Sequence, residues 1–323
     1  MAFSRFTPAA TGAARIGLGL AAVGRPGYIN LGRARDLPAP RTPEALRART
    51  HQLLDAAHAA GVRYLDTARS YGRAEEFLAD WLTGRPEAAD VVVGSKWGYT
   101  YTADWRADAD VHEVKDHGAA MFDRQWAESR ALLGGRLDLY QIHSATQDSG
   151  VLADPAVLDR LARLADTGVD VGLSTSGPRQ AETIRAALEV ERGGRPLFRT
   201  VQATYNVLEQ SAAPALAEAH AAGRTVIVKE ALANGRLAGP EAPGELREVA
   251  DATGTGPDAV ALAAVLAQPW TGIVLSGAAT EGQLADNLAA ARLRLDAAHL
   301  EAFTRLAEPS DAYWRARSAL PWT

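Results

Sequence analysis

Eight short apolar or β-branched segments alternate along this chain with longer segments of helical periodicity. Several are apolar almost throughout, as in Val91–Val93 and Val226–Val228, which is typical of parallel strands buried on both faces. The eight segments are Arg15–Leu20, Arg63–Thr67, Val91–Ser95, Leu137–His143, Val169–Ser174, Thr200–Ala203, Thr225–Lys229 and Gly272–Ser276. They predict an α/β fold, because right-handed crossovers close eight strand–helix units into one (β/α)8 (TIM) barrel.

Turn and capping residues mark the ends of the expected helices. The first is expected from Pro43 to Ala60, with Thr42 as its N-cap and Gly61 after its end. Further helix starts are expected at Asp154–Pro155, at Ser176 or Gly177 before Pro178, and at Gly256–Pro257. No linker rich in Pro, Gly and Ser divides the chain, so residues 1–323 are expected to form a single barrel domain.

Two connections are longer than usual for such a fold, namely Gly24–Arg41 after the first expected strand and Trp97–Met121 after the third. Both follow the carboxyl ends of strands, the face of a barrel where active sites are built, and long loops there are usually functional.

A tail rich in aromatic residues follows the last expected helix, near Asp296–Leu306. Disordered tails are poor in aromatic residues, so we expect this one to be ordered. Its aromatic side chains either pack against the barrel wall or cover the barrel mouth and form, with Trp97 and Trp105, an apolar wall for the substrate.

Composition excludes several classes of function. The net charge is −5 and no Lys/Arg run stands out, so neither a nucleic-acid nor a membrane-surface partner is expected. The chain has no cysteine and its seven histidines are scattered, so no disulfide, thiol catalysis or metal site is expected. Arginines interrupt the apolar residues of the first segment, and neither a signal peptide nor a transmembrane helix is expected there. We therefore expect a cytoplasmic protein.

The segment Gly17–Ala22 matches the glycine pattern of a dinucleotide-binding fingerprint, and Asp36 follows it. That fingerprint requires a helix to open directly at the glycines, so that its N-terminus meets the pyrophosphate. Gly24, Pro26 and Gly27 prevent such a helix here. We interpret the glycines as the packed end of a barrel strand.

Four polar residues stand at or just beyond the ends of three consecutive expected strands: Asp66, Tyr71, Lys96 and His143. Singly, each has a structural explanation, such as a core salt bridge between Asp66 and Lys96 or a hydrogen-bonded core histidine. Together they converge on one barrel mouth and favour a catalytic site.

The four residue types suit proton transfer to a carbonyl group. A phenol is a poor acid at neutral pH, and we expect the Lys96 ammonium, oriented by Asp66, to lower the pKa of Tyr71. His143 can donate a hydrogen bond to the carbonyl oxygen as negative charge develops there. No side chain supplies hydride, so a nicotinamide cofactor is implied.

Three motifs around these residues resemble, in the same order, those of the aldo-keto reductase catalytic tetrad. They are Leu65–Gly72 (LDTARSYG), Ser95–Gly98 (SKWG) and Leu137–Ser144 (LDLYQIHS). The resemblance extends from about Gly17 to Ala291 and implies an NAD(P)H-dependent oxidoreductase. In it Tyr71 is the general acid, Lys96 and Asp66 tune that acid, and His143 orients the carbonyl.

The resemblance also implies a set of cofactor-binding residues. Ser174, Thr175 and Gln202 correspond to the contacts of the nicotinamide amide, and Tyr205 to a ring that stacks on the nicotinamide. The loop Val228–Gly239 resembles the one that covers the pyrophosphate. From that loop and from the adenosine side, the implied residues are Lys229, Leu232, Arg236, Gly277, Gln283 and Asn287.

Two departures from the family pattern concern the cofactor. Ala279 stands where many relatives carry a basic residue for the 2′-phosphate of NADP(H). Glu230 stands where a small hydroxyl residue is usual, and it would repel a pyrophosphate unless Lys229 or Arg236 pairs with it. NADP(H) remains favoured by the resemblance, and NAD(H) is possible.

The sequence thus predicts an oxidoreductase that transfers hydride between NADP(H) or NAD(H) and a small carbonyl or alcohol, whether aldehyde, ketone or sugar. One alternative is a non-catalytic, regulatory protein that binds a nicotinamide cofactor on the same barrel, since fold and bound cofactor do not dictate turnover. Another is a barrel isomerase or lyase that uses no nicotinamide.

Overall fold

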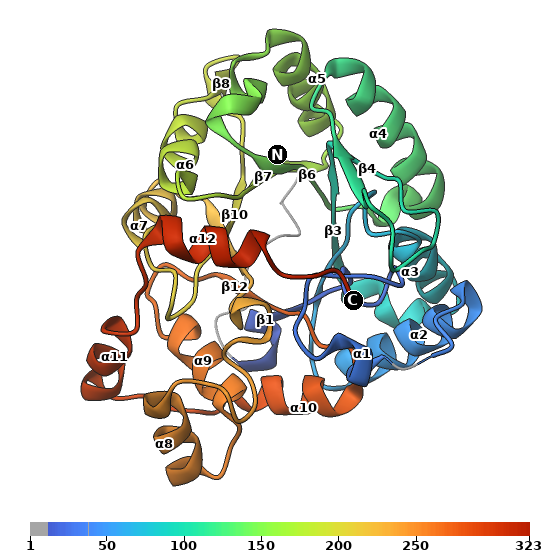
Figure 1. Cartoon of the computed structure of the whole chain (residues 1–323). Coiled ribbons are helices and arrows are strands. Elements are labelled where there is room, and N and C mark those ends of the chain that lie inside the picture. Colours follow the sequence, from blue (N-terminus) through green and yellow to red (C-terminus); the bar gives the residue numbers. More distant parts are fainter. Residues whose placement is uncertain (1–11, 38) are drawn as a thin grey trace.

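Eight parallel strands close into a barrel with helices around it (Figure 1). The computed structural model describes residues 12–37 and 39–323. The strands are β1 (Ile16–Gly19), β2 (Tyr64–Asp66), β3 (Val92–Trp97), β6 (Leu139–Ala145), β7 (Asp170–Thr175), β10 (Thr200–Thr204), β11 (Thr225–Lys229) and β12 (Ile273–Ser276). They neighbour one another in this order, and β12 pairs in parallel with β1. The predicted (β/α)8 barrel and its eight strands are confirmed.

Helices follow the strands along the chain. They are α2 (Pro43–Ala59), α3 (Ala74–Thr83), α4 (Ala119–Leu133), α5 (Pro155–Asp166), α6 (Gln180–Leu188), α7 (Ala213–Ala221), α8 (Gly244–Thr253), α9 (Pro257–Leu266), α10 (Glu281–Ala289) and α11 (Ala297–Thr304). Thr42 caps α2 by accepting a hydrogen bond of 3.2 Å from the backbone N–H of Ala45, as predicted. The expected start of α6 at Pro178 is wrong, because Gly177, at φ 88°, opens a turn and the helix begins at Gln180.

The long loops and the tail carry further structure at the barrel mouth. The loop after β1 contains the short helix α1 (Arg33–Asp36), and the loop after β3 forms an antiparallel hairpin of β4 (Tyr99–Tyr101) and β5 (Glu113–Lys115). The tail forms α12 (Ser310–Ser318), which lies across the opening of the barrel in Figure 1. In the part of the chain that the structure describes, no helix is long and apolar enough to span a bilayer.

Tyr64 fills space inside the barrel that two glycines leave open. It belongs to a buried cluster with Leu139, Ile227 and residues of β12. A Cβ at Gly94 would overlap with the Tyr64 hydroxyl, and one at Gly17 would lie 2.8 Å from the Tyr64 ring. The Tyr64 hydroxyl in turn donates a hydrogen bond of 3.0 Å to Asp66. Packing inside the barrel therefore supports a candidate catalytic residue directly.

We expect Gly94→Ala to destabilise the fold by about 1–3 kcal/mol, because the added methyl group displaces the ring of Tyr64 in a close-packed interior. Thermal unfolding followed by circular dichroism measures the effect. Gly135→Ala is the matched control, since a Cβ at Gly135 meets no atom within 4 Å. Equal midpoints for both variants would contradict this account of the barrel interior.

Candidate active site

Four polar side chains meet at the carboxyl-terminal end of the barrel. Asp66 ends β2, and Tyr71 lies in the loop that leads to α3, while Lys96 lies in β3 and His143 in β6. The Lys96 ammonium forms an ion pair with Asp66, and its nitrogen lies 5.0 Å from the centroid of the Tyr71 ring. The rings of Tyr71 and His143 meet edge to face, with centroids 5.5 Å apart. The structure brings together all four residues nominated from the sequence.

The ion pair is buried and fully supported by hydrogen bonds. Lys96 also donates to the carbonyl oxygen of Thr67 at 3.0 Å. The second carboxylate oxygen of Asp66 accepts from the Tyr64 hydroxyl at 3.0 Å and from Nε2 of Gln202 at 2.8 Å. Because buried charges are tolerated only when paired and hydrogen-bonded, this network fixes the position of the Lys96 nitrogen under the Tyr71 ring.

Burial controls the protonation of Tyr71. Loss of water raises the pKa of the phenol well above its usual value, the charge of Asp66 raises it further, and the charge of Arg25 opposes both. The pKa of Tyr71 is therefore raised, and not lowered as expected, because burial and the charge of Asp66 outweigh the stabilising effect of nearby cations. At neutral pH Tyr71 therefore holds its proton, which is the state that a proton donor requires.

Burial has the opposite effect on His143. Loss of water, followed by the positive charges of Lys96 and Lys229, lowers the pKa of the imidazole well below its usual value. The ring is therefore neutral at neutral pH and carries one N–H to donate. Nδ1 of His143 lies 3.4 Å from the hydroxyl of Ser70.

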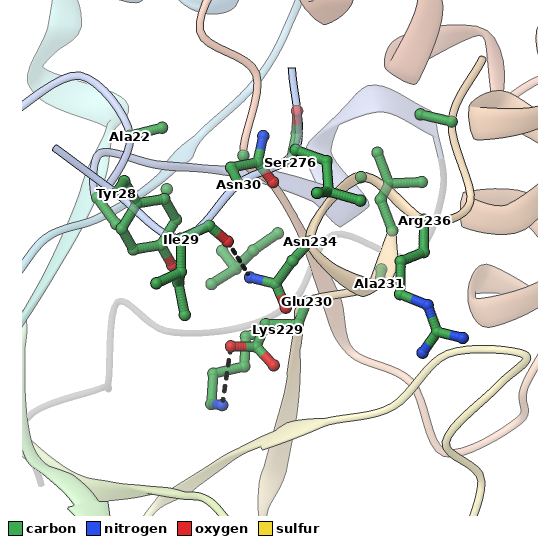
Figure 2. A pocket seen from close by; sticks show the side chains of 18 of the residues that line it. Ala22, Tyr28, Ile29, Asn30, Lys229, Glu230, Ala231, Asn234, Arg236 and Ser276 are labelled. Carbon is green, nitrogen blue, oxygen red and sulfur yellow. Dashed lines mark hydrogen bonds and ion pairs between the residues drawn. The ribbon is translucent and has the colours of Figure 1, made fainter. Parts of the chain in front are cut away.

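A cavity of about 1380 Å³ opens at this end of the barrel and is lined by Asp66, Tyr71 and His143. It continues past the loop after β11 to the start of α10. Figure 2 shows Tyr28, Asn234 and Lys229 around this cavity, from the loop after β1 and from β11 and the loop that follows it. The residues nominated for the cofactor that line it are Gln202, Lys229, Leu232, Arg236, Gly277, Gln283 and Asn287.

The model of the Aldo/keto reductase family matches residues 15–308 of this chain, which include the barrel and the four converging side chains. The chain belongs to the aldo-keto reductase family. It is therefore an oxidoreductase.

Individual relatives agree with this assignment. The chain is 24% identical to aldo-keto reductase str7 of Strobilurus tenacellus over 293 residues, which cover 80% of this chain and 81% of that protein. It is 28% identical to an uncharacterized oxidoreductase of Mycobacterium bovis over 277 residues, 77% of this chain and 78% of the relative. The holo form of aldo-keto reductase AKR11C1 from Bacillus halodurans shares the fold, with a TM-score of 0.67, 21% identity and coverage of 91% and 92%.

Three residues nominated for the cofactor lie outside the cavity lining of this aldo-keto reductase. The hydroxyl of Ser174 accepts a hydrogen bond of 2.8 Å from the backbone N–H of Ser144. Thr175 is fully buried beside Gln180. Tyr205 packs edge to face on Trp270, with ring centroids 4.9 Å apart. Two serines that the sequence analysis missed line the cavity near these positions, Ser144 and Ser176.

Glu230 is neutralised by an arginine that the sequence analysis missed. Of the two expected partners, Lys229 forms an ion pair with Glu230 at 4.0 Å, whereas Arg236 pairs with Glu308. In addition, Arg317 of α12 contacts both carboxylate oxygens of Glu230, at 2.5 to 3.1 Å. The signal in the sequence was the acidic side chain itself, since a buried carboxylate needs a cation from some other segment.

The loop after β1 and the loop after β11 are joined across the cavity. The backbone N–H of Leu31 donates to the carbonyl of Asn234 at 2.9 Å. Figure 2 shows the second bond, in which Nδ2 of Asn234 donates to the carbonyl of Ile29 at 3.1 Å. The amide oxygens of Asn234 and Asn287 are buried without a hydrogen-bond partner in the described residues. Both residues line the cavity, so these acceptors fit a ligand with hydrogen-bond donors, such as the adenine and amide groups of a nicotinamide dinucleotide.

The tail combines both roles that were weighed from the sequence. Tyr313 and Trp314 are buried in a cluster with residues of α8, α9 and α11, so they pack on the barrel wall. Trp322 lines the cavity. The expected wall of Trp97 and Trp105 is wrong, because Trp97 is fully buried against Phe122 and Trp105 packs on Phe77 outside the lining.

The ion pair of Glu230 predicts a specific loss of stability in acid. Burial alone would raise the pKa of Glu230, but the charges of Lys229 and Arg317 and the hydrogen bonds from Arg317 and Thr204 lower it to about 2. Because the folded pKa lies below the unfolded one, this stabilisation is complete above about pH 4.5 and is lost as the pH falls towards 2.

We therefore expect Glu230→Gln to reduce the pH dependence of the free energy of unfolding in this window by up to about 3 kcal/mol. Urea unfolding of both proteins at pH values from 5 to about 3 measures it. Parallel curves for wild type and variant would show that Glu230 is not held as a carboxylate by Arg317.

Proposed function

We propose that this aldo-keto reductase is a nicotinamide-dependent carbonyl reductase, or alcohol dehydrogenase in the reverse direction, with Tyr71 as its proton donor and acceptor. The observation that carries the proposal is the position of Tyr71. Its ring lies beside the neutral His143 and over the buried Lys96–Asp66 pair, and it lines the large cavity.

The side chains divide the proton chemistry among themselves. In reduction, Tyr71 gives its proton to the carbonyl oxygen while His143 donates a hydrogen bond to the same oxygen. The phenolate that results lies near the Lys96 ammonium, which is held in place by its ion pair with Asp66. A bound nicotinamide supplies the hydride, and in oxidation accepts it.

The far end of the cavity would hold the dinucleotide. Gln202 and Ser176 line the catalytic end, whereas Gly277, Gln283 and Asn287 line the end at α10. Thr280 caps α10 by accepting from the backbone N–H of Gln283 at 3.2 Å, so a helix N-terminus, which favours anions, lies beside the cavity.

Charge at that end favours NAD(H) over NADP(H), contrary to the preference implied by the family resemblance. Asp258, in the first turn of α9, and Asp286 of α10 both line the cavity. Burial raises the pKa of Asp258, and the nearby charge of Asp286 raises it further. Two carboxylates disfavour a 2′-phosphate, whereas a carboxylate accepts hydrogen bonds from the ribose hydroxyl of NAD(H). Ala279 lies outside the cavity lining and offers no cation to a 2′-phosphate.

Tyr71→Phe tests the proton donor. We expect carbonyl reduction to fall by about 10²- to 10⁴-fold, because the general acid is lost, with little change in the dissociation constant of the cofactor. Reduction of a panel of aldehydes is followed by absorbance of the reduced cofactor, and binding by its fluorescence. Tyr99→Phe removes another phenol of the same cavity and is the matched control. Turnover by Tyr71→Phe at the level of the control would overturn the mechanism.

Asp286→Arg tests the cofactor preference. The variant replaces a repulsive charge with a charge-assisted contact of about 1.5–3 kcal/mol, so the ratio of NADPH to NADH affinity should rise by about tenfold or more. Asp251→Arg makes the same charge change on α8, outside the cavity lining, and should leave the ratio unchanged. An unchanged ratio in Asp286→Arg would show that the 2′ position lies elsewhere.

A further inference from the structure

Arg25 is a fully buried cation beside the proposed proton donor. It follows β1 and is 1% exposed. Its guanidinium carbon lies 5.2 Å from the centroid of the Tyr71 ring, 5.1 Å from that of Tyr28 and 4.8 Å from that of Trp322. Arg25 also lines the cavity. The guanidinium carbon of Arg25 therefore lies almost as close to the centroid of the Tyr71 ring as the Lys96 nitrogen does, at 5.0 Å.

Two glycines allow the backbone to position Arg25 beside Tyr71. The carbonyl of Gly24 accepts a hydrogen bond of 2.8 Å from the backbone N–H of Arg73. A Cβ at Gly24 would overlap with the carbonyl oxygen of Tyr71, and one at Gly72 would lie 2.8 Å from the Cβ of Arg25. Gly72 also has φ 61°, where side chains are strained. The loop that bears Arg25 is therefore held in direct contact with the loop that bears Tyr71.

Arg25, like Lys96, forms an ion pair with a carboxylate. Nη1 of Arg25 donates to Glu113 of β5 at 2.6 Å and to the carbonyl oxygen of Ser70 at 2.9 Å. Tyr71 thus lies between two cation–carboxylate pairs, Lys96–Asp66 from inside the barrel and Arg25–Glu113 from the loops above it.

The tail holds the outer side of Arg25. The Trp322 ring, which Arg25 contacts, stacks on His112 with centroids 4.0 Å apart and planes 6° apart. The backbone of Thr323 exchanges two hydrogen bonds of 3.1 Å with that of Tyr28. The guanidinium is consequently fixed in a protein cage of aromatic rings, where its charge is poorly screened by water.

We propose that Arg25 is a second positioning residue of the proton donor, which stabilises the negative charge of the Tyr71 oxygen whenever its proton is on the substrate. The proposal rests on the proposed role of Tyr71. It assigns to Glu113 the opposing role, because that carboxylate holds Arg25 in place and partly cancels its charge.

The other charged groups near Tyr71 support this division. Burial and Asp66 raise the pKa of Tyr71, Arg25 lowers it, and Glu113 and Glu230 raise it. Lys96 is paired with Asp66, and Glu230 is paired with Arg317. Among the remaining titratable groups that face Tyr71, His143 is neutral at neutral pH, and burial raises the pKa of Tyr28 and of Tyr64.

The two members of the pair should therefore shift the pH profile in opposite directions. In alcohol oxidation the Tyr71 phenolate accepts the proton, so kcat/KM rises with pH along the limb set by its pKa. Arg25→Gln should move this limb to higher pH by about one unit, seen as a roughly tenfold lower kcat/KM at each pH along it. Glu113→Gln should move the limb to lower pH. Arg25→Lys retains the charge and should keep the limb near the wild-type position.

Arg41→Gln is the matched control for a merely structural role. Arg41 lies in the same loop and donates to the carbonyls of Leu37 and Pro26, at 2.7 and 2.8 Å. Loss of the Arg41 side chain should change the rates without shifting the rising limb of the kcat/KM profile along the pH axis. Circular dichroism verifies that each variant is folded, and Glu113→Gln and Arg25→Lys decide the matter if Arg25→Gln does not fold.

Opposite shifts in Arg25→Gln and Glu113→Gln, with none in Arg41→Gln, would support the proposal. Shifts in the same direction, or no shift in Glu113→Gln, would overturn it. Failure of the proposed function is distinguishable, because Tyr71→Phe would then retain turnover. If Tyr71→Phe is inactive while the Arg25 and Glu113 variants leave the limb in place, only the role of Arg25 is wrong.

Discussion

The ion pair of Lys96 and Asp66 is the interaction on which the site depends. Two charges inside a barrel mouth lose their hydration, a loss that only close pairing and complete hydrogen bonding offset. Thr67, Tyr64 and Gln202 supply those hydrogen bonds, from β2 or the residue after it and from β10. The position of the Lys96 nitrogen under Tyr71 is therefore a consequence of how the barrel closes, because β2, β3 and β10 lie at different places around it.

The rim of the barrel repeats this arrangement with partners from distant parts of the chain. Glu230, after β11, is paired with Arg317 in the tail, and Arg25, after β1, is paired with Glu113 in the hairpin. Each pair links segments that are far apart in the sequence. The tail, the hairpin and the loop after β1 are thereby fixed over the mouth by the same requirement that fixes Lys96, namely that a buried charge must have a partner.

The features that could be predicted from the sequence are those that local sequence patterns determine. Eight apolar segments and the capping of α2 by Thr42 were enough for the barrel and its order, and strand ends were enough to bring Tyr71 and Lys96 together. The direction in which each side chain points was harder to predict from the sequence. At the end of β7 neighbouring residues face different surroundings, so Ser176 lines the cavity and Ser174 does not. Arg317 could not be nominated because its partner lies 87 residues away in sequence.

Burial, rather than the charge of Lys96, sets the protonation of the reactive pair. Losing water favours the neutral form of every titratable group, which raises the pKa of Tyr71 and lowers that of His143. A carbonyl oxygen in this cavity would therefore meet two neutral hydrogen-bond donors. Neither donor carries a charge before the reaction begins. Negative charge appears on Tyr71 only after proton transfer, and at that moment an ammonium at 5.0 Å and a guanidinium carbon at 5.2 Å already flank its ring. Cations fixed in advance need no reorganisation as that charge develops, so they favour the transition state over the ground state.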